Sequence, residues 1–132
     1  MNKKQVDRLI PKAYEVLRTV QIDNGNDSQH PFKIVETGGI QKAWRGQISS
    51  FGAAIATGSL PAAISFFSAK GHSELHRELL MKAIFELLEQ RGDSRDLFDY
   101  VSKNTDKQRA VEEEIVNRAI ALKFAMNLYP LV

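Results

Sequence analysis

Residues 45–59, RGQISSFGAAIATGS, decide the fold because a helical repeat of large apolar residues runs through a segment that contains three glycines. Glycine in a helix interior costs about 1 kcal/mol relative to alanine. The predicted helix spans residues 40–57, and its apolar stripe consists of Ile40, Trp44, Ile48, Phe51 and Ile55. This spacing predicts that the stripe faces the core of a helical protein.

The other side of this helix is nearly free of side chains beyond a basic start. It carries Lys42, Arg45, Gly46, Ser49, Gly52, Ala53 and Ala56. Small residues let another chain come close to a helix backbone, so the glycines indicate that something contacts this side. The candidates are a neighbouring helix of the same chain, a partner protein and a nucleic-acid phosphate chain.

The segment that includes this helix, residues 46–69, contains no charged residue. A membrane span needs about 20 apolar residues. This run holds five serines and is broken by Gly-Ser-Leu-Pro at 58–61. Two short helices therefore fit better than a membrane span: Ser59 is a good N-cap, Pro61 is tolerated in a first turn, and Gly71 is a natural stop.

The rest of the chain also shows helical spacing, and no segment shows sustained alternation of period two. We expect helices at about 3–20, 40–57, 60–70, 74–91, 95–103 and 106–128. Pro11 lies inside the first, which therefore bends or restarts there. Ser94 is the expected cap of the fifth, and the breaker-rich residues 23–39 are expected to form a loop. With 132 residues, the chain is predicted to be a single-domain, all-α bundle of about six helices.

Composition narrows the class of protein further. The hydrophobic content of 43% is enough to form a hydrophobic core. The net charge of +2 is too small to indicate nucleic-acid binding by itself. The absence of cysteine excludes disulfides, cysteine-based zinc sites and thiol catalysis. The basic N-terminal segment lacks an apolar stretch typical of a signal peptide, so we expect a cytoplasmic protein.

No arrangement of residues supports catalysis or a bound cofactor. His72 and His76 are four apart but straddle a predicted helix start, without an HExxH frame. Five residues separate Gly52 from Gly58, one too many for a phosphate loop. The consecutive residues 112–114 are glutamates that point in different directions on a helix. We expect no enzyme, no metal, no cofactor and no small-molecule substrate.

Basic residues beside small ones are the remaining chemical signal. Lys42 and Arg45 stand one turn apart beside Gly46, where a phosphate chain has room to approach. Lys70 ends the predicted helix at 60–70, and Arg77 follows shortly after. Each of these four residues is a candidate nucleic-acid contact, and for each an ordinary surface charge is the alternative.

One longer stretch combines several sequence patterns. Residues 44–71, WRGQISSFGAAIATGSLPAAISFFSAKG, open with Trp44-Arg45-Gly46 and close with the pattern A-x-x-F-x-x-x-K-G, which starts at Ala63. Two further segments, LIPKAYEVL near the start and ALKFAMNL near the end, contribute to the same resemblance. The chain thus resembles, over nearly its whole length, the small all-helical subunit of the type III-B CRISPR effector, the Cmr RNA-targeting complex.

This resemblance implies a function without catalysis. Copies of such a subunit stack into an inner filament beside the backbone subunits that hold the crRNA, and they support target RNA binding without reading sequence. RNA cleavage in the family belongs to the backbone subunit. The resemblance assigns RNA contacts to Lys42, Arg45 and Lys70, with Arg77 as a weaker addition.

Two predicted partner surfaces complete the expectations. The first is the thin side of the second helix at Gly46, Ser49 and Gly52. The second is the acidic stretch 92–106, in which Asp96 and Asp99 would dock against the basic N-terminal part of the next copy. In an alternative interpretation, the protein is a helical protein–protein adaptor with no nucleic-acid contact.

Overall fold

A computed structural model of the chain describes residues 1–69 and 75–132. In these residues the fold is mostly helical, as predicted. Its six α-helices are α1 (Lys3–Thr19), α2 (Ala43–Thr57), α3 (Leu60–Phe67), α4 (Glu78–Leu87), α5 (Leu97–Lys103) and α6 (Gln108–Met126), and a short 3₁₀ turn (Thr105–Lys107) precedes the last.

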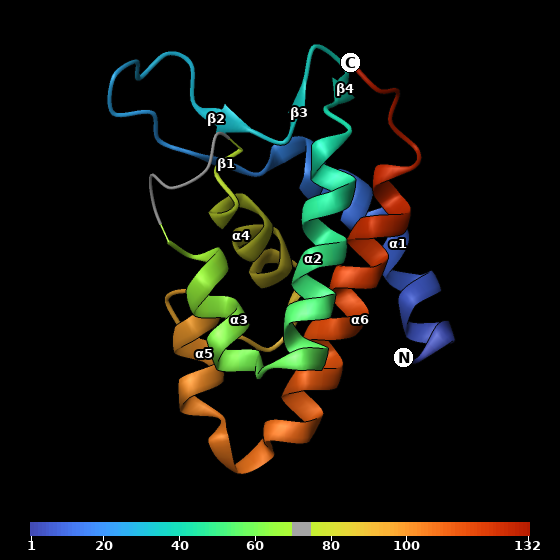
Figure 1. The fold of residues 1–132 in the computed structure, drawn as a ribbon, viewed down its shortest axis with the longest axis vertical. Coiled ribbons are helices and arrows are strands. Elements are labelled where there is room, and N and C mark those ends of the chain that lie inside the picture. Colours follow the sequence, from blue (N-terminus) through green and yellow to red (C-terminus); the bar gives the residue numbers. More distant parts are fainter. Residues whose placement is uncertain (70–74) are drawn as a thin grey trace.

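The two longest helices, α1 and α6, pack against each other and form one side of the bundle (Figure 1). Helix α2 lies beside α6 and runs in the opposite direction, while α3 folds back against α2. Helix α4 contacts α1, α3, α5 and α6 and supplies fully buried side chains such as Leu80, Ile84 and Leu87 to the core. Helix α4 therefore lies in a central, largely buried position.

The expected loop at 23–39 is only partly a loop, because two small antiparallel ladders bracket and interrupt it. Strand β1 (Gln21–Ile22) pairs with β2 (Phe32–Lys33), and β3 (Val35–Glu36) pairs with β4 (Gly39–Ile40). Thr37 and Gly38 join the second pair, both with positive φ, as a tight two-residue hairpin turn requires. Two-residue strands are too short to show alternation in a sequence, which is why these ladders were not predicted.

Several helix boundaries also differ from the predictions. Because Ile40 lies in β4, helix α2 begins at Ala43 and not at 40. Helix α4 begins at Glu78, two residues after His76, whose positive φ of 52° is incompatible with a helix. It ends at Leu87 rather than at 91, and α3 ends at Phe67. Residues 70–74, including the predicted end of the third helix, lie outside the described residues.

The junction between α2 and α3 follows the sequence prediction. Gly58 ends α2, and the side chain of Ser59 accepts a hydrogen bond of 3.2 Å from the backbone N–H of Ala62. Pro61 occupies the first turn of α3. In α1, Pro11 lies inside one continuous helix, so no second helix starts there.

Two buried polar side chains of α6 tie the ends of other helices to the core. Asn117 is fully buried; its Oδ1 accepts a hydrogen bond from the backbone N–H of Asn2 and its Nδ2 donates one to Gln5. Arg118 is only 2% exposed and donates from Nε to the Leu87 carbonyl at 3.0 Å. Since α4 ends at Leu87, this bond satisfies a carbonyl that the helix itself leaves unpaired.

Candidate interaction surfaces

The thin side of α2 is exposed in the folded chain. Trp44 and Phe51 are buried, whereas Gly46, Ser49 and Gly52 are exposed. A Cβ atom added at Gly46 or Gly52 would meet nothing within 4 Å. Among the described residues, therefore, no helix of the same chain packs against these two glycines.

A groove runs between this side of α2 and the neighbouring helix α6, and we call it the α2–α6 groove. Its volume is about 190 Å³, and it is lined by Ile48, Ser49, Gly52, Ala53, Ile55, Val116, Ala119, Ile120 and Lys123. Phe124, later in α6, and Leu128, just beyond its end, are 46% and 59% exposed. Val116 and Ile120 are four residues apart and so lie on one side of α6, but only the fold places that side beside α2.

The two basic residues predicted as nucleic-acid contacts in the second helix lie at the start of α2. Lys42 is exposed and immediately precedes the helix, and Arg45 is half-buried in its first turn. Neither makes an ion pair with any residue in 1–69 or 75–132, and the Nε of Arg45 is buried without a hydrogen-bond partner. The helix dipole adds further positive potential to this end, although the N–H groups of Trp44 and Arg45 donate to the carbonyls of Gln41 and Lys42.

Arg77 has a different environment from the other predicted basic contacts. Its guanidinium group lies over the ring of Phe66, with 4.5 Å between the carbon Cζ and the ring centroid, and 5.3 Å from the centroid of Phe67. A hollow of about 80 Å³ is lined by both Trp44 and His76, so the segment before α4 adjoins the start of α2. Lys70, the fourth predicted contact, lies outside the described residues.

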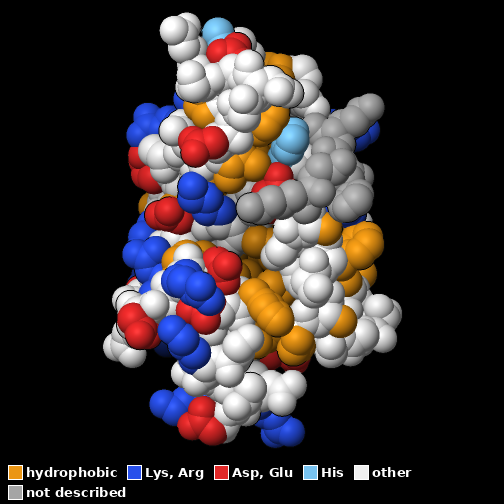
Figure 2. Space-filling view, turned by 90° about the vertical axis from the view of Figure 1, so that its left-hand side faces the viewer, with side chains coloured by type: hydrophobic (Ala, Val, Ile, Leu, Met, Phe, Trp, Pro, Cys, Tyr) orange, Lys and Arg blue, Asp and Glu red, His pale blue; other side chains and the backbone are white. Residues whose placement is uncertain are grey.

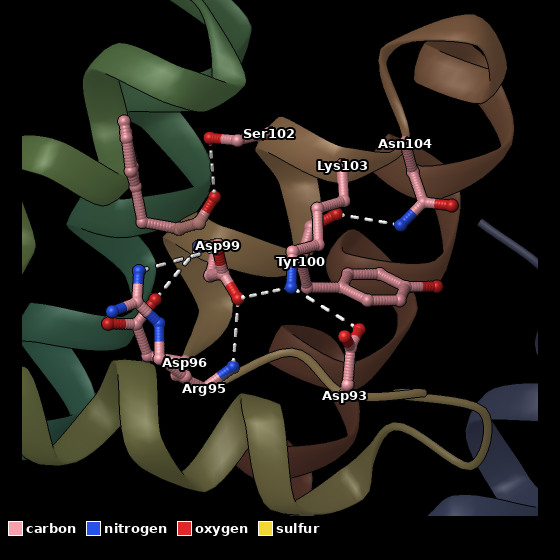
Figure 3. Close-up of polar contacts among 9 residues, drawn as sticks. Asp93, Arg95, Asp96, Asp99, Tyr100, Ser102, Lys103 and Asn104 are labelled. Atoms are coloured by element: carbon pink, nitrogen blue, oxygen red, sulfur yellow. Dashed lines mark hydrogen bonds and ion pairs between the residues drawn. The ribbon is translucent and has the colours of Figure 1, made fainter.

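The predicted acidic contacts are engaged within their own helix. Asp96, and not Ser94, caps α5, and its side chain accepts a hydrogen bond of 2.8 Å from the backbone N–H of Asp99. The Asp99 carboxylate accepts a bond of 2.9 Å from the backbone N–H of Arg95 and lies 3.1 Å from Lys103 Nζ (Figure 3). The backbone hydrogen bond from Arg95, followed by the contact with Lys103, lowers the pKa of Asp99.

This arrangement predicts an acid-sensitive contribution to stability. Because the pKa of Asp99 is lower in the folded state, its contribution is present above about pH 4 and is lost as the pH falls through the lowered pKa. We expect Asp99→Asn to be less stable than the parent at pH 7, with a difference that shrinks toward pH 2. Urea unfolding across this range measures it, and Asp93→Asn is the control because the Asp93 side chain is 94% exposed. Equal pH dependence in both variants would contradict the assignment.

A second, larger pocket was not predicted from the sequence. It has a volume of about 390 Å³, lies between α4 and α5, and is lined by Ile22, Ser68, Glu78, Met81, Lys82, Phe85, Glu86, Arg95, Asp96, Leu97 and Phe98. Figure 2 looks onto the left-hand side of Figure 1 and shows hydrophobic side chains at the surface among Lys, Arg, Asp and Glu. The lining of this pocket comes from β1, from Ser68 after α3, from α4 and from residues 95–98, and periodicity alone does not bring these segments together.

The described residues hold no group of three His, Asp or Glu side chains that could coordinate a metal ion. His30 pairs with Asp27 at 2.6 Å and His76 with Glu78 at 3.2 Å, each as an isolated pair. Among the helices in 1–69 and 75–132, none is both long enough and apolar enough to cross a bilayer.

Comparison of the chain with protein-family models, with curated proteins and with solved structures finds no match.

Proposed function

We propose that this protein is the non-catalytic small subunit of a type III-B CRISPR interference complex, the Cmr complex, acting in antiviral defence in the cytoplasm. In this role it stacks with further copies of itself beside the backbone subunit and supports binding of the crRNA–target RNA duplex. The observation that carries the proposal is the exposed thin side of α2, with Lys42 and Arg45 at its start, neither of which makes an ion pair with the described part of the chain.

The geometry of α2 suits a contact with phosphate rather than with bases. Gly46 and Ser49 are exposed and leave the backbone accessible, so a phosphate chain can approach Lys42 and Arg45 closely. Trp44 is 3% exposed and packed in the core, so it offers no ring on which a base could stack. Contacts of this kind neutralise charge and do not discriminate between sequences, as a subunit that follows a guide–target duplex requires.

The α2–α6 groove favours a second candidate, a helical adaptor that binds only protein. Its lining is mostly apolar and includes the small residues Ser49, Gly52 and Ala53, and helices commonly bind in such grooves. The two candidates differ in the role of the basic start of α2. The Cmr subunit would use it to bind RNA, whereas an adaptor of this kind would not.

The test is the double variant Lys42→Ala/Arg45→Ala in the assembled complex. We expect weaker retention of target RNA and a salt dependence that is flatter by roughly 1.5 in the slope of log K against log salt, since each lost phosphate contact removes about 0.7 to 0.9. Filter binding between 50 and 200 mM salt measures both quantities.

The matched control is Lys107→Ala/Arg109→Ala, which likewise removes one lysine and one arginine from exposed positions. If the two double variants have equal slopes of log K against log salt, Lys42 and Arg45 do not belong to the RNA interface. Gel-shift titration of the isolated protein with RNA at low and moderate salt separates the candidates further, because an adaptor without nucleic-acid contact shows no salt-dependent shift.

A further inference from the structure

The exposed side of α6 carries a short apolar stripe with one charged residue at each end. Val116 and Ile120 are half-buried and line the α2–α6 groove. Glu113 lies three residues before Val116, and Lys123 lies three residues after Ile120; both are exposed. Spacings of three and four place all four on one side of the helix.

The charges at the two ends of this stripe have no partner among the residues that the structure describes. Neither Glu113 nor Lys123 takes part in an ion pair or hydrogen bond with any residue that the structure describes. Glu112 directly precedes Glu113, and Arg109 lies one turn nearer the start of α6; these two residues carry opposite charges. The stripe is therefore acidic at one end through Glu113 and basic at the other through Lys123.

The stripe formed by these four residues is complementary to a second copy of itself that runs in the opposite direction. If a second α6 lies antiparallel to the first about a point near residue 118, Val116 faces Ile120 of the second copy and Glu113 faces its Lys123. The two-fold axis repeats both contacts, so two ion pairs about 15 Å apart would flank an apolar centre.

Helix α2 leaves room for this approach. Ser49, Gly52 and Ala53 form the opposite wall of the groove, and none of them projects far from the helix. Side chains of a second α6 can therefore settle between α2 and α6, at the interaxial distance of about 8–10 Å that packed helices adopt.

We propose that the α2–α6 groove is a self-complementary interface that pairs two copies of this chain about a two-fold axis, with α6 antiparallel to α6. The pairing goes beyond the proposed function and does not rest on it. A two-fold contact closes on itself, so it forms a dimer of the free subunit and is distinct from stacking into a filament.

The experiment measures the mass of the isolated protein by sedimentation equilibrium from 10 µM to 1 mM. We expect a concentration-dependent dimer. Glu113→Lys and Lys123→Glu should each weaken dimerisation by roughly tenfold or more, because each replaces two attractive contacts with two like-charge contacts. The double variant Glu113→Lys/Lys123→Glu restores both pairs and should recover the parental affinity. A mixture of the two single variants should give mainly mixed dimers.

Lys33→Glu is the matched control, because Lys33 is exposed in β2 and does not line the groove. Ile120→Glu should abolish dimerisation, with circular dichroism to verify that the helices remain. A monomer throughout the concentration range would overturn the proposal, as would failure of the double variant to recover. These readouts contain no RNA, so their failure is distinguishable from failure of the proposed function.

Discussion

Phe51→Ala is expected to lower the free energy of unfolding by about 4 kcal/mol, since removal of a fully buried phenylalanine costs about 3–5 kcal/mol. Phe51 is 0% exposed, and its ring meets that of Phe67 edge-on, with 5.3 Å between the centroids. The pair joins α2 to α3, so the cavity left by alanine would open at the contact that holds the two helices together. Urea unfolding followed by circular dichroism measures the change.

The neighbouring residue supplies the control for this prediction. Gly52→Ala adds a methyl group where nothing lies within 4 Å. We expect this variant to be more stable than the parent by about 0.5 to 1 kcal/mol, because alanine is the better helix former. A loss of stability at Gly52 would show that the thin side of α2 is not free in solution, and a loss below about 1 kcal/mol at Phe51 would contradict its place in the core.

Arg118→Ala is the second substitution with a large expected effect, a loss of about 3 kcal/mol. The Arg118 side chain is buried and donates to the carbonyls of Leu87 and Glu114, at 3.0 and 3.1 Å. Its removal leaves the Leu87 carbonyl at the end of α4 without this bond and opens a cavity. Thermal and urea unfolding should agree on the loss.

Arg109→Ala separates this effect from the loss of a charge on the same helix. Arg109 is exposed and makes no ion pair with the described part of the chain, so we expect a change within about 0.5 kcal/mol. Arg118→Met keeps much of the buried apolar volume but loses the hydrogen bonds. If this variant is as stable as the parent, packing and not hydrogen bonding holds α4 and α6 together.

The parts of the fold that the sequence predicts are those set by local physics. The apolar spacing from Trp44 to Ile55 and the break at Gly58 depend on residues within one or two turns of each other, and both are confirmed. The two ladders depend instead on pairing across the 21–40 region. The early end of α4 depends on Arg118, which is distant in sequence and supplies the hydrogen bond at Leu87.

The candidate surfaces divide in the same way. The spacing of Gly46, Ser49 and Gly52 predicted a side of α2 without large side chains, but it left open whether a helix of the same chain covers that side. The partner wall on α6 was not predicted, because residues more than sixty positions apart form one groove only after folding. The roles of Asp96 and Asp99 in capping α5 depend on where that helix starts, and the sequence offered Ser94 as an equally good cap.

The ladder between β1 and β2 has a consequence for how the chain could be divided. Between these strands the backbone leaves the helical body and returns, and the amide of Asn24 closes this arc by donating to the carbonyl of His30 at 3.2 Å. Helix α1 is joined to the rest of the protein by its packing on α4 and α6 and by Asn117, in addition to this exposed connection. The arc is thus a natural insertion point for a reporter sequence, one that leaves the α2–α6 groove uncovered.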